Sequence, residues 1–164
     1  MLEAVDYSGR RGVIVQFLPQ VYEIILRDAR ADRAETIEPP ENIIFWKQRM
    51  RKELVDTSRR YIFLMENDAV RGFAFYRFGE GSRVYLDEFQ VTTRGGLDLL
   101  LTKLQQDTSL AAKEFYAGGR IRVDRDEEML AAVKLSRGRG EDGFESLGGL
   151  SETVNILRLR YGQG

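Results

Sequence analysis

The architecture of this chain follows from one stretch, Arg83-Val84-Tyr85-Leu86-Asp87-Glu88-Phe89-Gln90-Val91-Thr92-Thr93-Arg94-Gly95-Gly96. Its aromatic and β-branched residues predict a strand that carries two acidic residues. The glycine pair predicts a turn, and the leucines at 97, 100, 101 and 104 recur at helical spacing. A strand therefore brings two carboxylates close to the start of a helix.

The turn between this strand and helix has the components of a phosphate cradle. Backbone N–H groups at a helix start attract anions, glycine lets a ligand approach the chain, and Arg94 adds positive charge. The alternative is an ordinary strand-to-helix turn, in which glycine only permits positive φ. The sequence leaves both interpretations open.

Working outward, the segments before this strand predict an antiparallel meander. Tyr61 to Glu66 and Val70 to Phe78 are rich in aromatic and β-branched residues, with a turn at Asn67-Asp68 between them and a glycine-containing loop at 79–82. We expect these strands and the strand that starts at Arg83 to form the centre of a mixed sheet.

The flanking segments predict further strands and helices around this centre. We expect an α/β (α+β) fold in a single domain over residues 1–164, with a mixed, mostly antiparallel sheet of about six or seven strands and about four helices. The expected strands outside the meander are Leu2 to Tyr7, Ile121 to Val123, Phe144 to Leu147 and Val154 to Tyr161. The expected helices contain Phe17 to Ala29 with Pro19 in the first turn, Ile43 to Leu54, Leu97 to Glu114, and a segment from Asp124 or Asp126 to Leu135.

Composition excludes several classes of function. The chain has no cysteine and no histidine, which excludes a thiol nucleophile, a Ser/His/Asp triad and zinc sites built on those residues. The net charge of −1 argues against nucleic-acid binding, despite the Arg/Gly segment 137–140. No apolar run approaches the ~20 residues that span a membrane, so we expect a cytoplasmic protein. We also expect no metal site.

Residues 67–74 read Asn-Asp-Ala-Val-Arg-Gly-Phe-Ala, residues 86–91 read Leu-Asp-Glu-Phe-Gln-Val and residues 143–145 read Gly-Phe-Glu. These three phrases, in this order and spacing, resemble the GCN5-related N-acetyltransferase (GNAT) superfamily. The first is similar to the hairpin between the family's second and third strands, the second to its fourth strand, and the third to the opening of its penultimate strand. The loop after the fourth strand is shorter than the family's Arg-Gly-x-Gly-x-Gly run.

The resemblance implies transfer of an acyl group from acetyl-CoA to a primary amine of a small molecule or peptide. In that family the fourth and fifth strands splay and the pantetheine arm pairs with the fourth strand, which here implies Phe89, Gln90 and Val91. The pyrophosphate position falls to Arg94, Gly95 and Gly96, and the role of general base to Glu88. The general acid is not placed, with Tyr85 and Tyr116 as candidates.

Two alternatives accompany this hypothesis. Strand alternation predicts that Asp87 and Glu88 face opposite sides, so that at most one of them can face a given cleft. The alternative to a catalytic role is that one faces solvent and the other pairs with an arginine such as Arg77 or Arg83 across the sheet. At the level of function, the short loop and the unplaced acid favour a catalytically degenerate binding or assembly module. The oligomeric state, with a homodimer among the options, stays open.

Overall fold

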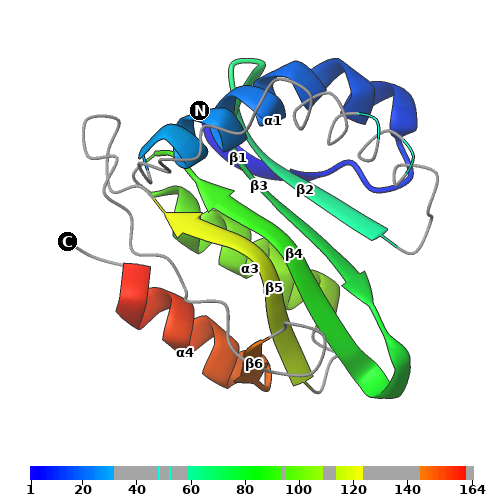
Figure 1. Ribbon diagram of the computed structural model, residues 1–164, viewed down its shortest axis with the longest axis vertical. Helices are drawn as coiled ribbons and strands as arrows, with labels where there is room; N and C mark the ends of the chain where they lie inside the picture. The colour runs from blue at the N-terminus through cyan, green and yellow to red at the C-terminus, as the bar shows by residue number, and fades with distance from the viewer. Residues whose placement is uncertain are drawn as a thin grey trace.

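The computed structural model describes residues 1–31, 48, 52, 59–93, 95–108, 114–123 and 145–161. In these ranges six strands form one sheet in the order β1-β2-β3-β4-β5-β6, and every neighbouring pair is antiparallel except β4 with β5 (Figure 1). The strands are β1 (Leu2–Asp6), β2 (Arg59–Glu66), β3 (Ala69–Phe78), β4 (Arg83–Val91), β5 (Glu114–Val123) and β6 (Glu145–Gly148). The helices are α1 (Arg11–Ala31), α3 (Gly96–Thr108) and α4 (Leu150–Tyr161), with a short 3-10 turn, η1 (Glu80–Ser82).

The predicted mixed sheet and its central meander are confirmed. Strands β2, β3 and β4 are consecutive neighbours with β1 on one side and β5 and β6 on the other. Asn67 and Asp68 join β2 to β3 with φ angles of 49° and 66°, which Asn and Asp tolerate better than other non-glycine residues. The register that follows from this turn sets which side chains of the meander share a face.

The first helix begins earlier than the sequence predicts, which makes the expected place of Pro19 wrong. Helix α1 starts at Arg11, where the carbonyl of Arg10 accepts hydrogen bonds from Val13 and Ile14, and Pro19 lies inside the helix. Proline cannot donate to the carbonyl of the residue four positions earlier. That residue, Val15, is 39% exposed. Water can therefore reach this part of the helix.

Three predictions for the C-terminal half of the chain are also wrong. Helix α3 ends at Thr108 rather than at Glu114, because Glu114 already pairs with Arg83 in strand β5. That strand runs through Gly118-Gly119, so it is longer than the expected Ile121 to Val123. The segment Val154 to Tyr161 lies in α4, because Val154 and Leu157 are buried three residues apart with the exposed Asn155 between them, a helical period.

Two predicted helices fall almost entirely on residues that are not described. The helix expected at Ile43 to Leu54 is described only at Gln48 and Lys52, which are helical. The helix expected up to Leu135 and the Arg/Gly segment 137–140 lie outside the described residues.

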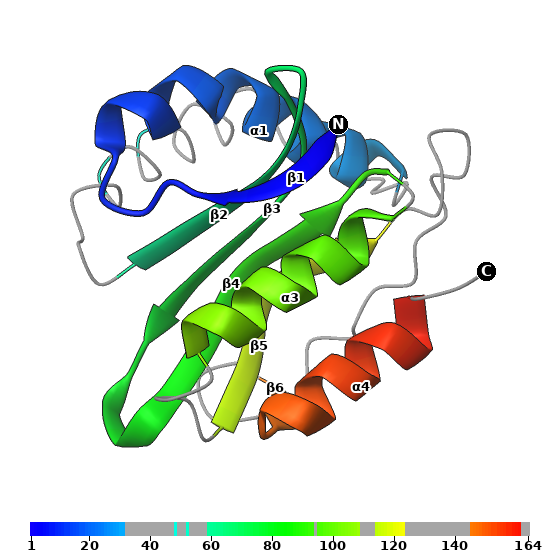
Figure 2. The same cartoon turned by 180° about the vertical axis from the view of Figure 1, so that it is seen from behind.

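The helices cover opposite faces of the sheet. Helix α1 lies on one face, where its buried residues pack with the aromatic side chains of β2 and β3, among them Phe63, Phe73 and Phe75. Helices α3 and α4 lie side by side on the other face (Figure 2), over a core that includes Tyr76, Leu86 and Phe89. These two faces are called the α1 face and the α3 face below.

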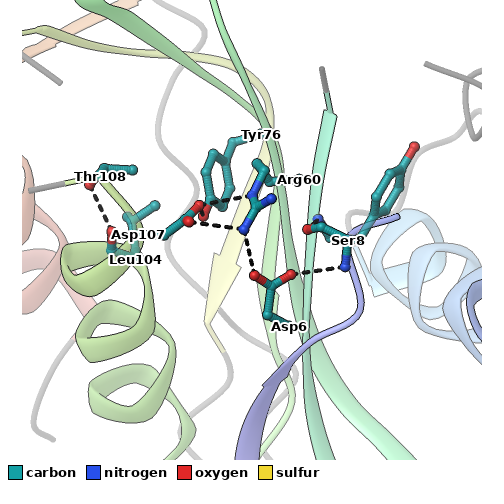
Figure 3. A network of polar contacts seen from close by, with 8 residues as sticks. Asp6, Ser8, Arg60, Tyr76, Leu104, Asp107 and Thr108 are labelled. Carbon is teal, nitrogen blue, oxygen red and sulfur yellow. Dashed lines mark hydrogen bonds and ion pairs between the residues drawn. The ribbon is translucent and has the colours of Figure 1, made fainter. Parts of the chain in front are cut away.

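A polar network fastens the C-terminal end of α3 to the sheet (Figure 3). Arg60 binds both carboxylate oxygens of Asp107 at 3.1 and 2.9 Å, and its Nη2 also reaches Asp6 at 2.6 Å. The hydroxyl of Tyr76 donates to the same Asp107 carboxylate. Burial and this hydrogen bond raise the pKa of Tyr76, so its hydroxyl stays a donor at neutral pH. The network joins β1, β2, β3 and the last turn of α3.

At the other end of α3, a glycine allows the helix to pack closely against the sheet. A Cβ atom at Gly96, the first residue of the helix, would lie 2.7 Å from the Cδ1 atom of Leu64 and 2.9 Å from the Cγ1 atom of Val91. Both distances are shorter than real side chains tolerate. Only glycine lets the first turn of α3 approach β2 and β4 this closely.

We therefore expect Gly96→Ala to lower the free energy of unfolding by about 1–3 kcal/mol, because the added methyl group overpacks the contact with Leu64 and Val91. Urea unfolding measures the change. Gly12→Ala is the matched control, since a Cβ at Gly12 meets nothing within 4 Å and alanine favours a helix. Equal stability of the two variants would contradict the packing argument.

Candidate active site

A β-bulge in β4 places both acidic residues on one face of the sheet. Phe75 pairs with Glu88 and Tyr76 pairs with Leu86, so Asp87 is an extra residue in β4. Phe75 belongs to the α1 face, and Asp87 reaches arginines that lie on that face. The expectation that Asp87 and Glu88 face opposite sides is therefore wrong, because the extra residue interrupts the alternation of the strand.

Asp87 is held by two arginines. Its Oδ2 lies 2.8 Å from Nη2 of Arg59 and 3.4 Å from Nε of Arg77. The side chains of Asp87 and Arg59 are only 15% and 11% exposed. Arg77 is one of the partners that the sequence indicated, whereas the sequence analysis did not identify Arg59. This pairing suits a carboxylate that shapes the site rather than one that accepts a proton.

Glu88 lies beside aromatic side chains of β2 and β3, next to this pair. Its cross-strand partner is Phe75, whose ring is 4.8 Å from the ring of Phe73 and 4.9 Å from that of Tyr61, centroid to centroid. The residue is partly buried, and its Oε2 atom is shielded from solvent. The site thus offers one carboxylate beside an arginine pair and one beside aromatic rings.

The backbone of the next residues is paired on both sides. Phe89, Gln90 and Val91 pair with β3 and, at the same time, with residues 121–123 of β5. A register shift separates this part of the β4–β5 ladder from the part that ends at the Leu86–Ala117 pair. A pantetheine arm that paired with these three residues would therefore have to displace β5 from them.

The loop between β4 and α3 is short and anchored at its start. Thr92 donates from its backbone N and its hydroxyl to the carbonyl of Arg71, at 2.9 and 2.6 Å. The N–H of Gly96 donates to the carbonyl of Thr93, while Gly95 has a φ angle of 84° and open space at its Cβ position. Arg94 lies outside the described residues. The first-turn amides beyond Gly96 are the donors available to an anion.

The two tyrosine candidates for the general acid stack on one another. The rings of Tyr85 and Tyr116 are 5.4 Å apart, and the guanidinium groups of Arg77 and Arg83 lie over Tyr85 and Tyr116 respectively. A hydrogen bond with Glu114 raises the pKa of Tyr116, which keeps that phenol protonated at neutral pH. The assignment of either tyrosine as the acid stays a prediction.

Two features are absent from the described residues. These residues hold no group of three or more acidic, histidine or cysteine side chains arranged to bind a metal ion. Within the same ranges, no helix has the length and apolar character needed to cross a membrane.

The order of the strands, the parallel pair β4–β5 and the placement of the helices give the chain a fold similar to that of a solved N-acetyltransferase. The protein resembles the PaiA N-acetyltransferase of Thermoplasma acidophilum in complex with coenzyme A, with a TM-score of 0.51 and 14% identity over 74% of this chain and 80% of that one. At these identities the likeness concerns the fold alone.

Two other solved structures are less similar. One is an acetyltransferase of the GNAT family from Staphylococcus aureus, with a TM-score of 0.48 and 11% identity over 72% of this chain and 73% of that one. The other is the ribosomal-protein-alanine N-acetyltransferase of Brucella melitensis, with a TM-score of 0.42 and 19% identity over 74% of both chains. No family model and no curated protein matches the sequence.

Proposed function

We propose that the protein is an N-acyltransferase that moves the acetyl group of acetyl-CoA to a primary amine. The observation that carries this proposal is the bulge at Asp87, which turns Glu88 onto the α1 face with a shielded Oε2 atom beside aromatic rings. A carboxylate placed in this way is suited to take a proton from an incoming ammonium group. The GNAT fold supports the same reaction class without identifying the acceptor.

In a ternary complex of the protein, acetyl-CoA and the amine, each residue has a separate role. Glu88 accepts the proton of the ammonium, directly or through one water, and the neutral amine then attacks the thioester carbonyl. The carbon–nitrogen bond forms, the carbon–sulfur bond breaks, and the proton that the attacking nitrogen loses passes to the leaving thiolate. Backbone N–H groups of β4 polarise the carbonyl oxygen, and the asymmetric pairing of Asp87 with Arg59 and Arg77 fixes the strand at the bulge.

Binding of acetyl-CoA along Phe89 to Val91 requires residues 121–123 to separate from β4, because those backbones now pair. We expect hydrogen exchange of the amides at 121–123 to accelerate roughly tenfold or more when CoA saturates the protein. The amides of Tyr61 to Glu66 in β2, away from this ladder, are the internal control. CoA binding with unchanged protection at 121–123 would contradict this route.

A degenerate binding or assembly module is the second candidate, and a specific observation favours it. Both edges of β4 at Phe89 to Val91 are occupied within the fold, and the N–H of Gly96 is already bonded to Thr93. A protein that had lost its cofactor would be expected to close in this way. Calorimetric titration with acetyl-CoA and CoA separates the candidates, since binding supports the transferase and its absence at millimolar ligand supports the module.

A further inference from the structure

The side chain of Gln90 is a buried polar group that the reaction described above does not use. The residue is 1% exposed, and among the described residues its Nε2 atom has no hydrogen-bond partner. Buried donors are paired in the great majority of native structures, because leaving one unpaired costs its full desolvation. An unpaired amide at this position therefore calls for a functional reason.

The location of Gln90 links it to the candidate site. Its cross-strand partner is Phe73, a residue of the α1 face, so Gln90 lies on the same face as Glu88. The other buried residues of β2 and β3 on that face are apolar or aromatic: Tyr61, Phe63, Met65, Val70, Phe73 and Phe75. Glu88 and Gln90 thus form a two-residue polar track that lies between the Asp87–Arg59–Arg77 ion pairs and these apolar and aromatic side chains.

The chemistry of this track selects a kind of ligand. Glu88 attracts a cationic amine, and the Gln90 amide donates to an oxygen atom. That oxygen is best neutral, since a ligand carboxylate would be repelled by Glu88. Residues two apart on a strand are separated by roughly 6.5 Å, so hydrogen bonds of about 2.9 Å at each end leave roughly 3–6 Å between the ligand's nitrogen and oxygen.

We propose that Gln90 is a substrate-binding residue that selects primary amines carrying a neutral oxygen acceptor, an amide carbonyl or a hydroxyl, within two or three carbons of the nitrogen. This inference rests on the proposed function and adds the class of acceptor to it. When such an amine is bound, the Gln90 amide gains the partner that it otherwise lacks. An alkylamine of the same shape leaves it unpaired.

The test compares matched amines in wild type and Gln90→Met, a substitution that keeps the volume and removes the amide. The pairs are 2-aminoethanol against propylamine and glycinamide against isobutylamine, with glycine as the carboxylate arm. We expect wild type to prefer the oxygen-bearing amine of each pair by about 10–100-fold in kcat/KM and to discriminate against glycine. The preference should fall to within about twofold in Gln90→Met. The two pairs separate a hydroxyl from a carbonyl as the source of the oxygen.

A stability measurement gives an independent readout. Gln90→Met removes an unpaired buried amide, so the melting temperature should stay the same or rise by roughly 2–4 °C. Gln20→Met is the matched control, because the Oε1 atom of Gln20 accepts from the backbone N of Val70 at 2.8 Å. That control should lower the melting temperature and leave the preference for oxygen-bearing amines intact. A lower melting temperature in Gln90→Met would overturn the proposal.

Amine binding measured without acetyl-CoA separates this inference from the proposed function. Preferential binding of 2-aminoethanol or glycinamide to wild type, lost in Gln90→Met, supports the inference even if no transfer occurs, and in that case only the transferase function is overturned. Transfer without any preference within the pairs, or a preference that survives Gln90→Met, overturns the inference alone. Failure of every amine to bind or react overturns both.

Discussion

Replacing Glu88 with glutamine is expected to lower turnover about 100-fold or more while leaving CoA affinity within a few-fold of wild type. The substitution keeps the shape of the side chain and removes its capacity to accept a proton. Loss of a general base typically lowers turnover by a factor of about this size. The measurement is thiol release from acetyl-CoA with a panel of amines, across pH, for wild type and variant. Unchanged turnover in Glu88→Gln would exclude this carboxylate as the base.

Asp87→Asn is the matched control, since Asp87 is the neighbouring carboxylate on the same face. Its pairing with Arg59 and Arg77 leads us to expect lower stability with a smaller loss of turnover than in Glu88→Gln. Removing its charge leaves both guanidinium groups without this carboxylate, and the side chains of Asp87 and Arg59 are mostly buried. A larger loss of turnover in Asp87→Asn than in Glu88→Gln would exchange the roles of the two residues.

Arg60→Met is expected to lower the free energy of unfolding by about 2–3 kcal/mol, because it leaves Asp6 and Asp107 facing one another without their shared cation. The estimate lies below that for a fully buried pair, since the Arg60 side chain is 31% exposed and solvent screens the charges. Because the network joins α3 to three strands, the loss should appear in the cooperative unfolding transition rather than as local fraying.

Urea unfolding at neutral pH measures this effect, with Arg158→Met as the control. Arg158 also pairs with an aspartate, Asp98, but the two side chains are 48% and 76% exposed, so this pair contributes little. Equal losses in the two variants would contradict the role of the network. A double-mutant cycle between Arg60→Met and Asp107→Asn should show coupling, because the two side chains form two hydrogen bonds to one another.

Local patterns were sufficient for the centre of the fold. The aromatic and β-branched runs from Tyr61 onward, the Asn67-Asp68 turn and the leucine spacing after Gly96 each act over a few residues, and each predicts its element correctly. The pattern was ambiguous for the short apolar run from Val154 to Tyr161. Its apolar residues allow a strand or a helix in isolation, and packing against α3 and β6 makes it a helix.

The candidate site depends on contacts between segments far apart in the sequence. Glu88 was identified from its strand, but the bulge that turns it and Asp87 to one face follows from how β4 pairs with β3, which strand alternation alone does not predict. Arg59 and Arg60 are adjacent in sequence, yet one binds Asp87 on the α1 face and the other binds Asp6 and Asp107 on the α3 face. Partners of this kind are set by sheet register and helix packing, because the free energy of an ion pair depends on distance and burial in the folded chain. Local sequence therefore determined the central strands and the start of α3, and tertiary packing decided the form of the last segment and which side chains meet.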